Sequence, residues 1–257
     1  MKCAGIAGNN SVYEGNVMNT TKFEHPRKPL MVAHRGVSGL ETENTHAAFV
    51  AAGNRSYYGI ETDVHVTSDG KYVAFHDDET RRLAAEDVII EQTEFATLRN
   101  MILRQKDGNF GRTDLRIPTM QEYIEICNQY EKIAVLELKN HFQKEQVFEI
   151  CDIIEGIGYL ENVIFISFDF ENLVYVKEKH PNQTVQFLTG RCDEELAKKL
   201  SSLNMDLDIY FEGFDAATAE RCHRYGIKVN CWTVDRVEDA ARLADLGATY
   251  ITSNILE

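Results

Sequence analysis

The feature that most constrains this chain is a repeated alternation of short apolar runs with amphipathic segments of helical length. Eight apolar runs of strand length follow residue 29: Leu30–His34, Ile60–Val66, Ile133–Lys139, Val163–Ser167, Val185–Leu188, Leu207–Phe211, Val229–Thr233 and Tyr250–Thr252. Strands that alternate with helices pair in parallel, and eight such units predict a closed (β/α)8 barrel of the TIM class. An open, doubly wound α/β sheet is the alternative. We expect a single domain over residues 30–257, preceded by an N-terminal extension over residues 1–29.

A hairpin signal follows the second predicted strand. Asp69-Gly70 stands between two extended runs, and this dipeptide strongly favours a tight β-turn. We therefore expect an antiparallel arm that folds back on the second strand. With Asp69-Gly70 as a two-residue loop, the predicted register pairs Ser68 with Lys71 and Asp63 with His76.

A short insertion is expected after this arm, over about residues 77–117. The segment is long, mixed in charge and weakly patterned. Long connections in compact domains usually cover a functional site or form a small subdomain.

Composition excludes several classes of protein. The 257 residues carry 27 Lys and Arg against 41 Asp and Glu, and a formal net charge of −14 argues against a nucleic-acid binder. No apolar stretch is long enough to suggest a membrane span. The six cysteines form no C-x-x-C pair, which favours reduced thiols and a cytoplasmic location. The sequence carries no signal for the oligomeric state.

Charged side chains gather where the predicted strands end. In a barrel of this class, the carboxyl ends of the strands and the loops after them form the active site. The candidates are His34 and Arg35 at the first strand, Glu61 and Asp63 on the second, His76 on the arm, Glu137 and Lys139 on the third, and Trp232 on the seventh.

Three of these candidates are carboxylates, and their spacing directs them to one place. Glu61 and Asp63 are two residues apart and so point to the same face of one strand. Together with Glu137 they cannot all stay ionised in a barrel interior without compensation. A divalent cation with oxygen ligands supplies it, and an all-carboxylate set favours Mg²⁺ or Ca²⁺ over zinc. Plain salt bridges to Arg35 and Lys139 are the alternative, and the spacing is compatible with both.

The remaining candidates suggest phosphate chemistry. His34 and His76 can divide general-base and general-acid work near neutral pH. Arg35 and Lys139 place positive charge beside the carboxylates, which suits the oxygens of a phosphate group. Trp232 is expected to form a wall of the pocket, although an ordinary buried aromatic residue is an equally good interpretation.

At these residues the sequence resembles the glycerophosphodiester phosphodiesterase family. The matching segments occur in the family's order: Val32-Ala33-His34-Arg35-Gly36, Glu43-Asn44-Thr45, Gly59-Ile60-Glu61-Thr62-Asp63-Val64, Asp69-Gly70, Phe75-His76-Asp77, Ile117-Pro118-Thr119, Leu136-Glu137-Leu138-Lys139, Ser167-Phe168 and Trp232-Thr233-Val234. Three of the family's segments differ here: Thr42 stands where Pro is usual, residues 76–84 depart from the usual His-Asp-x-x-Leu-x-Arg-Thr-Thr run, and residues 252–255 replace a Thr-Asp-x-Pro run.

The resemblance implies a role for each matching position. Glu61, Asp63 and Glu137 would be metal ligands, and His34 and His76 the catalytic acid–base pair. Arg35 and Lys139 would contact phosphate. Glu43 and Asn44 match positions that support the site in the family.

The implied enzyme is a metal-dependent hydrolase that cleaves glycerophosphodiesters to sn-glycerol 3-phosphate and an alcohol, through a cyclic phosphate. Its partner would be a small-molecule substrate. A lysophospholipase D, or a lyase that stops at the cyclic phosphate, is the first alternative, and an apolar acyl groove in the insertion would favour the former. A non-catalytic barrel that binds phosphodiesters is a more remote alternative.

Overall fold

Eight parallel strands close into a barrel in the computed structural model, which describes residues 19–257. The strands are β1 (Leu30–Ala33), β2 (Gly59–Val66), β4 (Ile133–Leu138), β5 (Val163–Ser167), β6 (Thr184–Thr189), β7 (Asp206–Tyr210), β8 (Val229–Trp232) and β9 (Tyr250–Ser253). The barrel closes because β1 pairs in parallel with both β2 and β9. The predicted (β/α)8 barrel is thereby confirmed, and each predicted strand corresponds to one of these eight.

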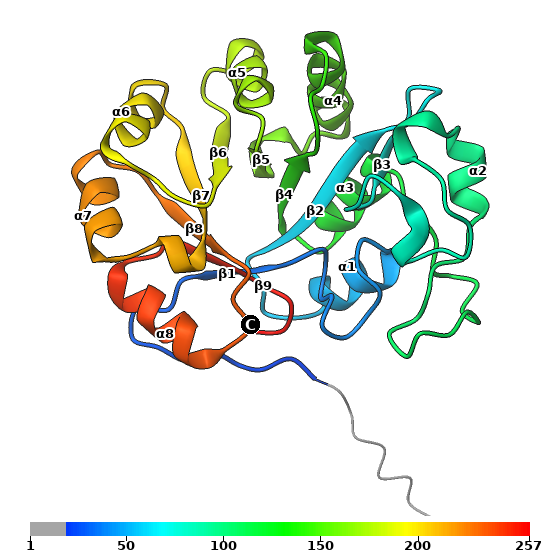
Figure 1. Ribbon diagram of the computed structural model, residues 1–257, viewed down its shortest axis with the longest axis horizontal. Helices are drawn as coiled ribbons and strands as arrows, with labels where there is room; N and C mark the ends of the chain where they lie inside the picture. The colour runs from blue at the N-terminus through cyan, green and yellow to red at the C-terminus, as the bar shows by residue number, and fades with distance from the viewer. Residues whose placement is uncertain (1–18) are drawn as a thin grey trace, which may run out of the picture.

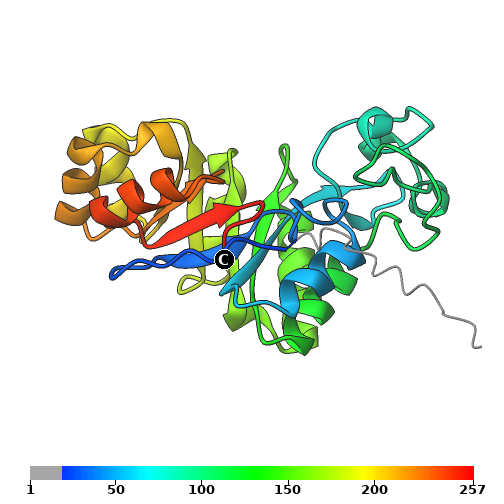
Figure 2. The ribbon, with the colours of Figure 1, turned by 90° about the horizontal axis from the view of Figure 1, so that it is seen from below.

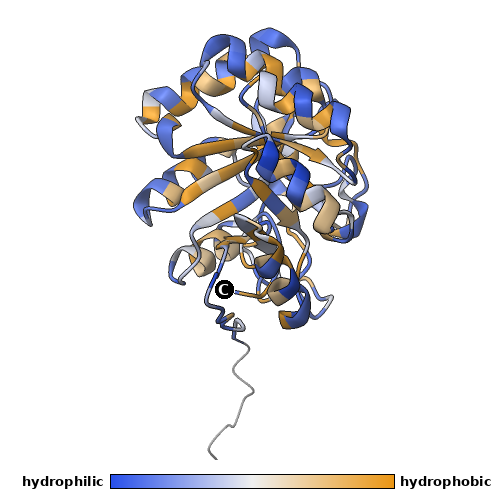
Figure 3. Ribbon diagram, turned by 90° about the vertical axis from the view of Figure 1, so that its left-hand side faces the viewer, coloured by the Kyte–Doolittle hydropathy of each residue, from blue (hydrophilic) through white to orange (hydrophobic). Residues whose placement is uncertain are grey.

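Helices surround the barrel and follow the strands in turn (Figure 1). They are α1 (His46–Gly53), α3 (Met120–Gln129), α4 (Lys144–Ile157), α5 (Phe170–Lys179), α6 (Glu194–Ser202), α7 (Ala216–Arg224) and α8 (Val237–Leu246). Figure 3 shows mostly apolar strands, whereas the helices alternate between apolar and polar residues. The main core therefore lies between the helices and the outer faces of the strands.

The barrel interior is apolar only in part. Val32, Val135, Ile164, Ile166 and Leu188 form an inner cluster with Tyr250. Residues two positions away on the same strands, such as Glu137 after Val135, point into the barrel as well, because alternate side chains of a strand share a face. The fold thus brings the polar strand ends into one enclosed space.

The expected antiparallel arm is present, but its predicted register is wrong by one residue. Strand β3 (Tyr72–Ala74) pairs with β2 so that Val66 lies opposite Tyr72. The loop therefore contains three residues, 68–70, and Asp63 lies beside Phe75, whose backbone N–H donates to the Asp63 carbonyl at 3.0 Å.

The side chain of Thr67 explains the longer loop. Its hydroxyl donates to Asp69 Oδ1 at 2.6 Å and accepts from the Lys71 backbone N–H at 2.9 Å. Gly70 takes a left-handed φ of +74°, which glycine adopts without a steric penalty. A side chain thus closes this turn, and the expectation of a two-residue Asp-Gly loop takes no account of that contact.

The segment after the arm forms a small body beside the barrel (Figure 2). It contains the short helices η1 (Thr80–Arg82), η2 (Ile90–Gln92) and α2 (Phe95–Asn100). Its own apolar cluster includes Ile90, Leu98, Leu103 and Leu115. This cluster explains how a weakly patterned segment stays ordered without a strand in the barrel.

The N-terminal extension is described only from residue 19, so most of the expected extension, with Cys3, lies outside the described residues. Thr21 forms a parallel bridge with Leu256, and the Phe23 backbone N–H donates to the Glu257 carbonyl at 2.7 Å. Phe23 is 1% exposed. In the described part of the chain, none of the helices has the length and apolar character needed to cross a membrane.

Candidate active site

A cavity of about 90 Å³ opens at the carboxyl ends of the strands. Seven of the residues singled out in the sequence line it: His34, Arg35, Glu61, His76, Glu137, Lys139 and Trp232. They come from both halves of the barrel and from the arm, so the fold gathers residues that are up to 198 positions apart. The register error therefore did not remove His76 from the site.

Three buried carboxylates cluster at the charged side of the cavity, where Glu61 and Glu137 line it and Asp63 does not. Glu61, Asp63 and Glu137 are 2%, 1% and 8% exposed, and one ligand atom from each lies within 4.8 Å of the others. Burial and the two neighbouring carboxylates raise the pKa of Glu61 well above its usual value. Burial and Asp63 raise the pKa of Glu137 to about 7. A divalent cation would relieve this repulsion, and the oxygen donors suit one, so these residues could hold a metal.

Two cations already balance part of this charge. Lys139 Nζ lies 2.9 Å from Glu137 Oε1 and 3.5 Å from Asp63 Oδ1, and Arg35 Nε lies 3.4 Å from Asp63 Oδ2. Burial opposes ionisation of Asp63, but Arg35 and Lys139 outweigh it and hold the Asp63 pKa well below its usual value. Salt bridges to Arg35 and Lys139 are therefore present, as one interpretation of the sequence expected. They leave the Glu61 carboxylate without an equivalent cation, so the other interpretation, a bound divalent cation, also has a physical basis.

The backbone at Arg35 positions this carboxylate. Arg35 takes a left-handed φ of +54°, and its backbone N–H donates to Glu61 Oε2 at 2.7 Å. Gly36 follows with a φ of +74°, where a Cβ atom would lie only 2.6 Å from the Ala48 carbonyl carbon. The close approach of α1 therefore requires the glycine that follows His34 and Arg35.

His34 is held by a residue near the end of the described chain. Its Nδ1 lies 2.8 Å from Asn254 Oδ1. The Asn254 amide is fixed in turn, because its Nδ2 donates to Asp235 Oδ2 at 2.6 Å. The Nδ1 atom of His34 must then carry the proton, which leaves Nε2 as the basic atom, 4.0 Å from Glu61 Oε2. Burial, together with Arg35, lowers the pKa of His34 to about 4.

His76 has a different partner. Its Nδ1 lies 2.6 Å from Asp77 Oδ1, so this ring also presents Nε2 as its second nitrogen. Burial lowers the His76 pKa, whereas the charge of Asp63 opposes this shift. A carboxylate at Nδ1 stabilises the protonated ring better than an amide does.

Glu43 and Asn44 lie behind the cavity and do not line it. Glu43 Oε1 accepts from Arg35 Nη1 at 2.7 Å. Asn44 is buried, donates to Asp63 Oδ2 at 2.8 Å and accepts from Thr62 Oγ1 at 2.7 Å. Their contacts orient a cation and a carboxylate of the site.

Arg82, at the end of η1, connects two of these supporting carboxylates. Its guanidinium donates to both Glu43 oxygens at 2.7 Å and to Asp77 at 2.6 and 3.1 Å. Glu43 contacts Arg35, and Asp77 contacts His76. No local sequence pattern assigns a role to Arg82, Asp77 or Asn254, because a contact between distant side chains leaves no such pattern.

The opposite side of the cavity is aromatic. The Trp232 ring lies 5.7 Å from the rings of both Phe168 and Tyr210, measured between centroids. Phe168 is 53% exposed and Tyr210 is 37% exposed. Beside them a wider hollow of about 520 Å³ shares Glu137, Lys139 and Phe168 with the cavity. The pocket therefore combines a charged side with an apolar rim.

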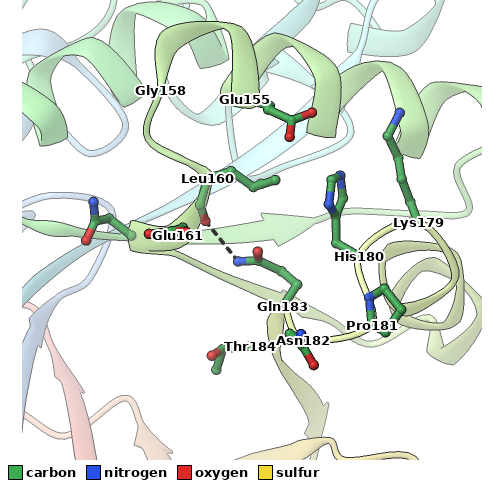
Figure 4. A pocket seen from close by; sticks show the side chains of 11 residues that line it. Glu155, Gly158, Leu160, Glu161, Lys179, His180, Pro181, Asn182, Gln183 and Thr184 are labelled. Carbon is green, nitrogen blue, oxygen red and sulfur yellow. Dashed lines mark hydrogen bonds between the residues drawn. The ribbon is translucent and has the colours of Figure 1, made fainter.

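A larger hollow of about 580 Å³ lies at the other end of the barrel, where η3 (Leu160–Asn162) enters β5 and the chain enters β6 (Figure 4). Two of its polar side chains, those of Gln183 and Lys179, are engaged in the fold. Gln183 Nε2 donates to the Leu160 carbonyl at 3.1 Å, and Lys179 Nζ donates to the Phe148 carbonyl at 3.0 Å. We therefore place the active site at the smaller cavity, where the charged groups converge.

Comparison with known proteins gives a family match over most of the chain. A model of the glycerophosphoryl diester phosphodiesterase family matches residues 34–256. This chain belongs to that family. It is therefore an enzyme, a phosphoric diester hydrolase, and the resemblance seen in the sequence is confirmed.

Relatives in the family align over most of the chain. A glycerophosphodiester phosphodiesterase of Caldanaerobacter subterraneus subsp. tengcongensis is 29% identical over 231 residues, which cover 88% of this chain and 94% of the relative. One of Bacillus subtilis is 23% identical and covers 89% and 84%. The structure of an Oleispira antarctica phosphodiesterase in complex with the product sn-glycerol-3-phosphate matches with a TM-score of 0.79 and 26% identity, covering 88% of this chain and 93% of the other.

Proposed function

We propose that this enzyme hydrolyses glycerophosphodiesters to sn-glycerol 3-phosphate and an alcohol. The observation that carries the proposal is the convergence of two imidazoles, three carboxylates and two cations on one cavity. The Oleispira antarctica phosphodiesterase was solved with sn-glycerol-3-phosphate as its product, which supports the same substrate class here. Arg35 and Lys139 would bind the phosphate oxygens, and Trp232 would contact the organic part of the substrate.

Glu61, Asp63 and Glu137 would hold the cation, for which we propose Mg²⁺ or Ca²⁺ because all the side-chain donors are carboxylate oxygens. When bound, the cation would stabilise negative charge on phosphoryl oxygen and lower the pKa of a neighbouring hydroxyl. Lys139 would remain between Glu137 and Asp63 and limit the net negative charge of the ligand set.

The two histidines would divide the proton transfers. His34 suits the general base, because its pKa of about 4 keeps Nε2 unprotonated at neutral pH. His76 suits the general acid, because Asp77 at its Nδ1 favours the protonated ring. His34 would take the proton of a glycerol hydroxyl that attacks phosphorus, and His76 would protonate the departing alkoxide. The product of this step is a cyclic phosphate, which water then opens with the two roles reversed.

The insertion does not favour a lysophospholipase D. An acyl chain needs an apolar groove, whereas the hollow at the start of the insertion is lined by Asp77, Asp78, Glu79, Arg81 and Arg82. The exposed rings of Phe168 and Tyr210 instead offer a short apolar surface for the alcohol. We also propose a cytoplasmic location, because the five described cysteines are free thiols buried in the fold.

A coupled assay for sn-glycerol 3-phosphate tests the proposal. Choline, ethanolamine, glycerol and inositol diesters of glycerol 3-phosphate are supplied with Mg²⁺, with Ca²⁺, or with excess chelator. We expect product from at least one diester with a cation, and none with chelator or with the His34→Ala/His76→Ala double variant. Full activity in chelator would exclude the cation mechanism. Accumulation of the cyclic phosphate alone would identify a lyase.

A further inference from the structure

The floor of the cavity contains a carboxyl group that the proposed reaction does not use. Asp208, on β7, lines the cavity together with Glu61 and Glu137 and is 1% exposed. Its Oδ2 accepts from Asn230 Nδ2 at 3.2 Å. Its Oδ1 is buried and has no hydrogen-bond partner among the described residues.

Strands β6 and β9, on either side of β7 and β8, extend this polar floor. Thr252, on β9, lines the same cavity, and its Oγ1 donates to Asn230 Oδ1 at 3.2 Å. Gln186, on β6, is 1% exposed, and within residues 19–257 neither atom of its side-chain amide has a hydrogen-bond partner. On the other side of the barrel, β1, β4 and β5 place Val32, Val135 and Ile164 in the interior.

This asymmetry has an energetic cost that a ligand could remove. A buried polar atom without a partner destabilises the folded protein, and three such atoms lie on two adjacent strands here, β6 and β7. The unpartnered Asp208 Oδ1 can accept a hydrogen bond, and the unpartnered Gln186 amide can both donate and accept. A hydroxyl group can likewise both donate and accept.

The volume of the cavity and the residues that line it limit further which ligands can bind there. Its volume of about 90 Å³ admits only a small molecule or one end of a larger one. Ile166 and Leu188 line it beside Asp208 and would contact a short carbon chain. A phosphate is excluded from this floor, because the fixed cations, Arg35 and Lys139, pair with Asp63 on the strands of the charged side.

We propose that Asp208, supported by Thr252, binds the terminal hydroxyl of the glycerol unit and so selects glycerol over diols that lack it. This inference rests on the proposed function, in which one glycerol oxygen is esterified and its neighbour attacks phosphorus. The third oxygen is then free to reach the floor. Asp208 would act in specificity and would transfer no proton in the reaction.

Two pairs of ligands separate this inference from the proposed function. The first pair comprises the choline diesters of glycerol 3-phosphate and of propane-1,2-diol 1-phosphate, which share the attacking hydroxyl and differ only in the terminal one. Their kcat/KM values are compared in wild type, Asp208→Asn, Asp208→Val and Thr252→Val. Asp206→Asn is the matched control, because Asp206 lies on the same strand but does not line the cavity. The second pair comprises the two phosphate monoesters, whose binding is measured by calorimetry without turnover.

We expect wild type and Asp206→Asn to prefer the glycerol compound by about tenfold or more, the equivalent of one satisfied buried hydrogen bond. In Asp208→Val the ratio of the two kcat/KM values should fall to about one, because kcat/KM decreases for the glycerol compound and stays unchanged for the propanediol compound. Should Asp208→Val fail to fold, Asp208→Asn and Thr252→Val must still reduce the preference. An unchanged preference in the folded variants, or no preference in wild type, would mean that the floor binds only water, and would overturn the inference. Discrimination between the monoesters without turnover of either diester would retain it and reject the proposed function.

Discussion

His34 and His76 present the same ring nitrogen to the cavity but have different groups behind them. His34 Nδ1 faces a neutral amide, Asn254, whereas His76 Nδ1 faces a carboxylate, Asp77. The electrostatic difference between these two partners is the basis for assigning base and acid. It also means that the two histidines should respond differently to the leaving group.

We expect His34→Ala and His76→Ala each to lower kcat at least about 10²-fold with an alkyl diester such as the choline compound. With a p-nitrophenyl leaving group, which needs no proton, His76→Ala should recover most of the activity and His34→Ala should not. Steady-state rates on both substrates provide the measurement. Recovery by His34→Ala instead would reverse the assignment, and the double variant should lose much less than the product of the single losses.

The carboxylates predict how cation affinity depends on pH. A carboxylate must be deprotonated to bind a cation, and the pKa of Glu137 is about 7 in the cation-free protein. Affinity for Mg²⁺ or Ca²⁺ should therefore rise as the pH increases toward 7 and level off above it. Calorimetric titrations on both sides of pH 7 would measure this. Glu137→Gln should weaken binding and flatten the dependence, whereas the exposed Glu125→Gln should behave as wild type. Affinity that falls with rising pH would contradict the assignment.

At the scale of the structural elements, η1 of the insertion is joined to the active site through Arg82. Arg82 contacts Glu43 and Asp77, and these contact Arg35 and His76. The adjacent Arg81 pairs only with Glu79 and Asp87 among the described residues. The two arginines thus have similar chemistry, but only one has a connection to the site.

Arg82→Gln should lower kcat by about 10- to 100-fold, the usual loss when a group that orients a site residue is removed. Removing this cation leaves the charge of Asp77 less balanced and raises the pKa of His76, so the basic limb of the pH–rate profile should move to higher pH. Arg81→Gln should leave both quantities unchanged. A loss of activity in Arg82→Gln without a shift of the basic limb would indicate only a structural role.

The sequence predicts those elements whose pattern lies within a single strand or helix, and it does not predict contacts between residues far apart in the chain. The eight strands and the triad of Glu61, Asp63 and Glu137 depend on alternation along single strands, so they were predictable. The hairpin register was not, because it depends on the Thr67 hydroxyl. The pairs His34–Asn254 and Glu43–Arg82 join positions 220 and 39 residues apart, and only the closed barrel brings them together.

At the scale of the whole molecule, the two ends of the described chain stabilise each other. Thr21 and Phe23 pair with the last residues of the chain, and Lys22 Nζ lies 2.5 Å from Glu257 Oε1. Phe23 belongs to the main core and is 1% exposed. The first described residues therefore act as part of the barrel's packing.

Phe23→Ala should lower the free energy of unfolding by about 3–5 kcal/mol, the usual cost of truncating a buried phenylalanine. Its kcat should stay near that of wild type, because Phe23 does not line the cavity. Urea unfolding and steady-state assays measure the two effects. Glu24→Ala, an exposed change at the next position, is the control and should alter neither. A large loss of kcat in the folded Phe23→Ala protein would contradict this separation.

The pairing of Thr21 with Leu256 also makes the protein suitable for circular permutation. Because the two ends of the described chain lie side by side, a short linker could join residue 257 to residue 19 without crossing the cavity. New termini could then be opened at the exposed tip around residues 107–111 of the insertion, away from every strand of the barrel. Such a circular permutant would keep each of the eight strands and the helices around them uncut, and it would separate the role of chain connectivity from that of the contacts that close the barrel.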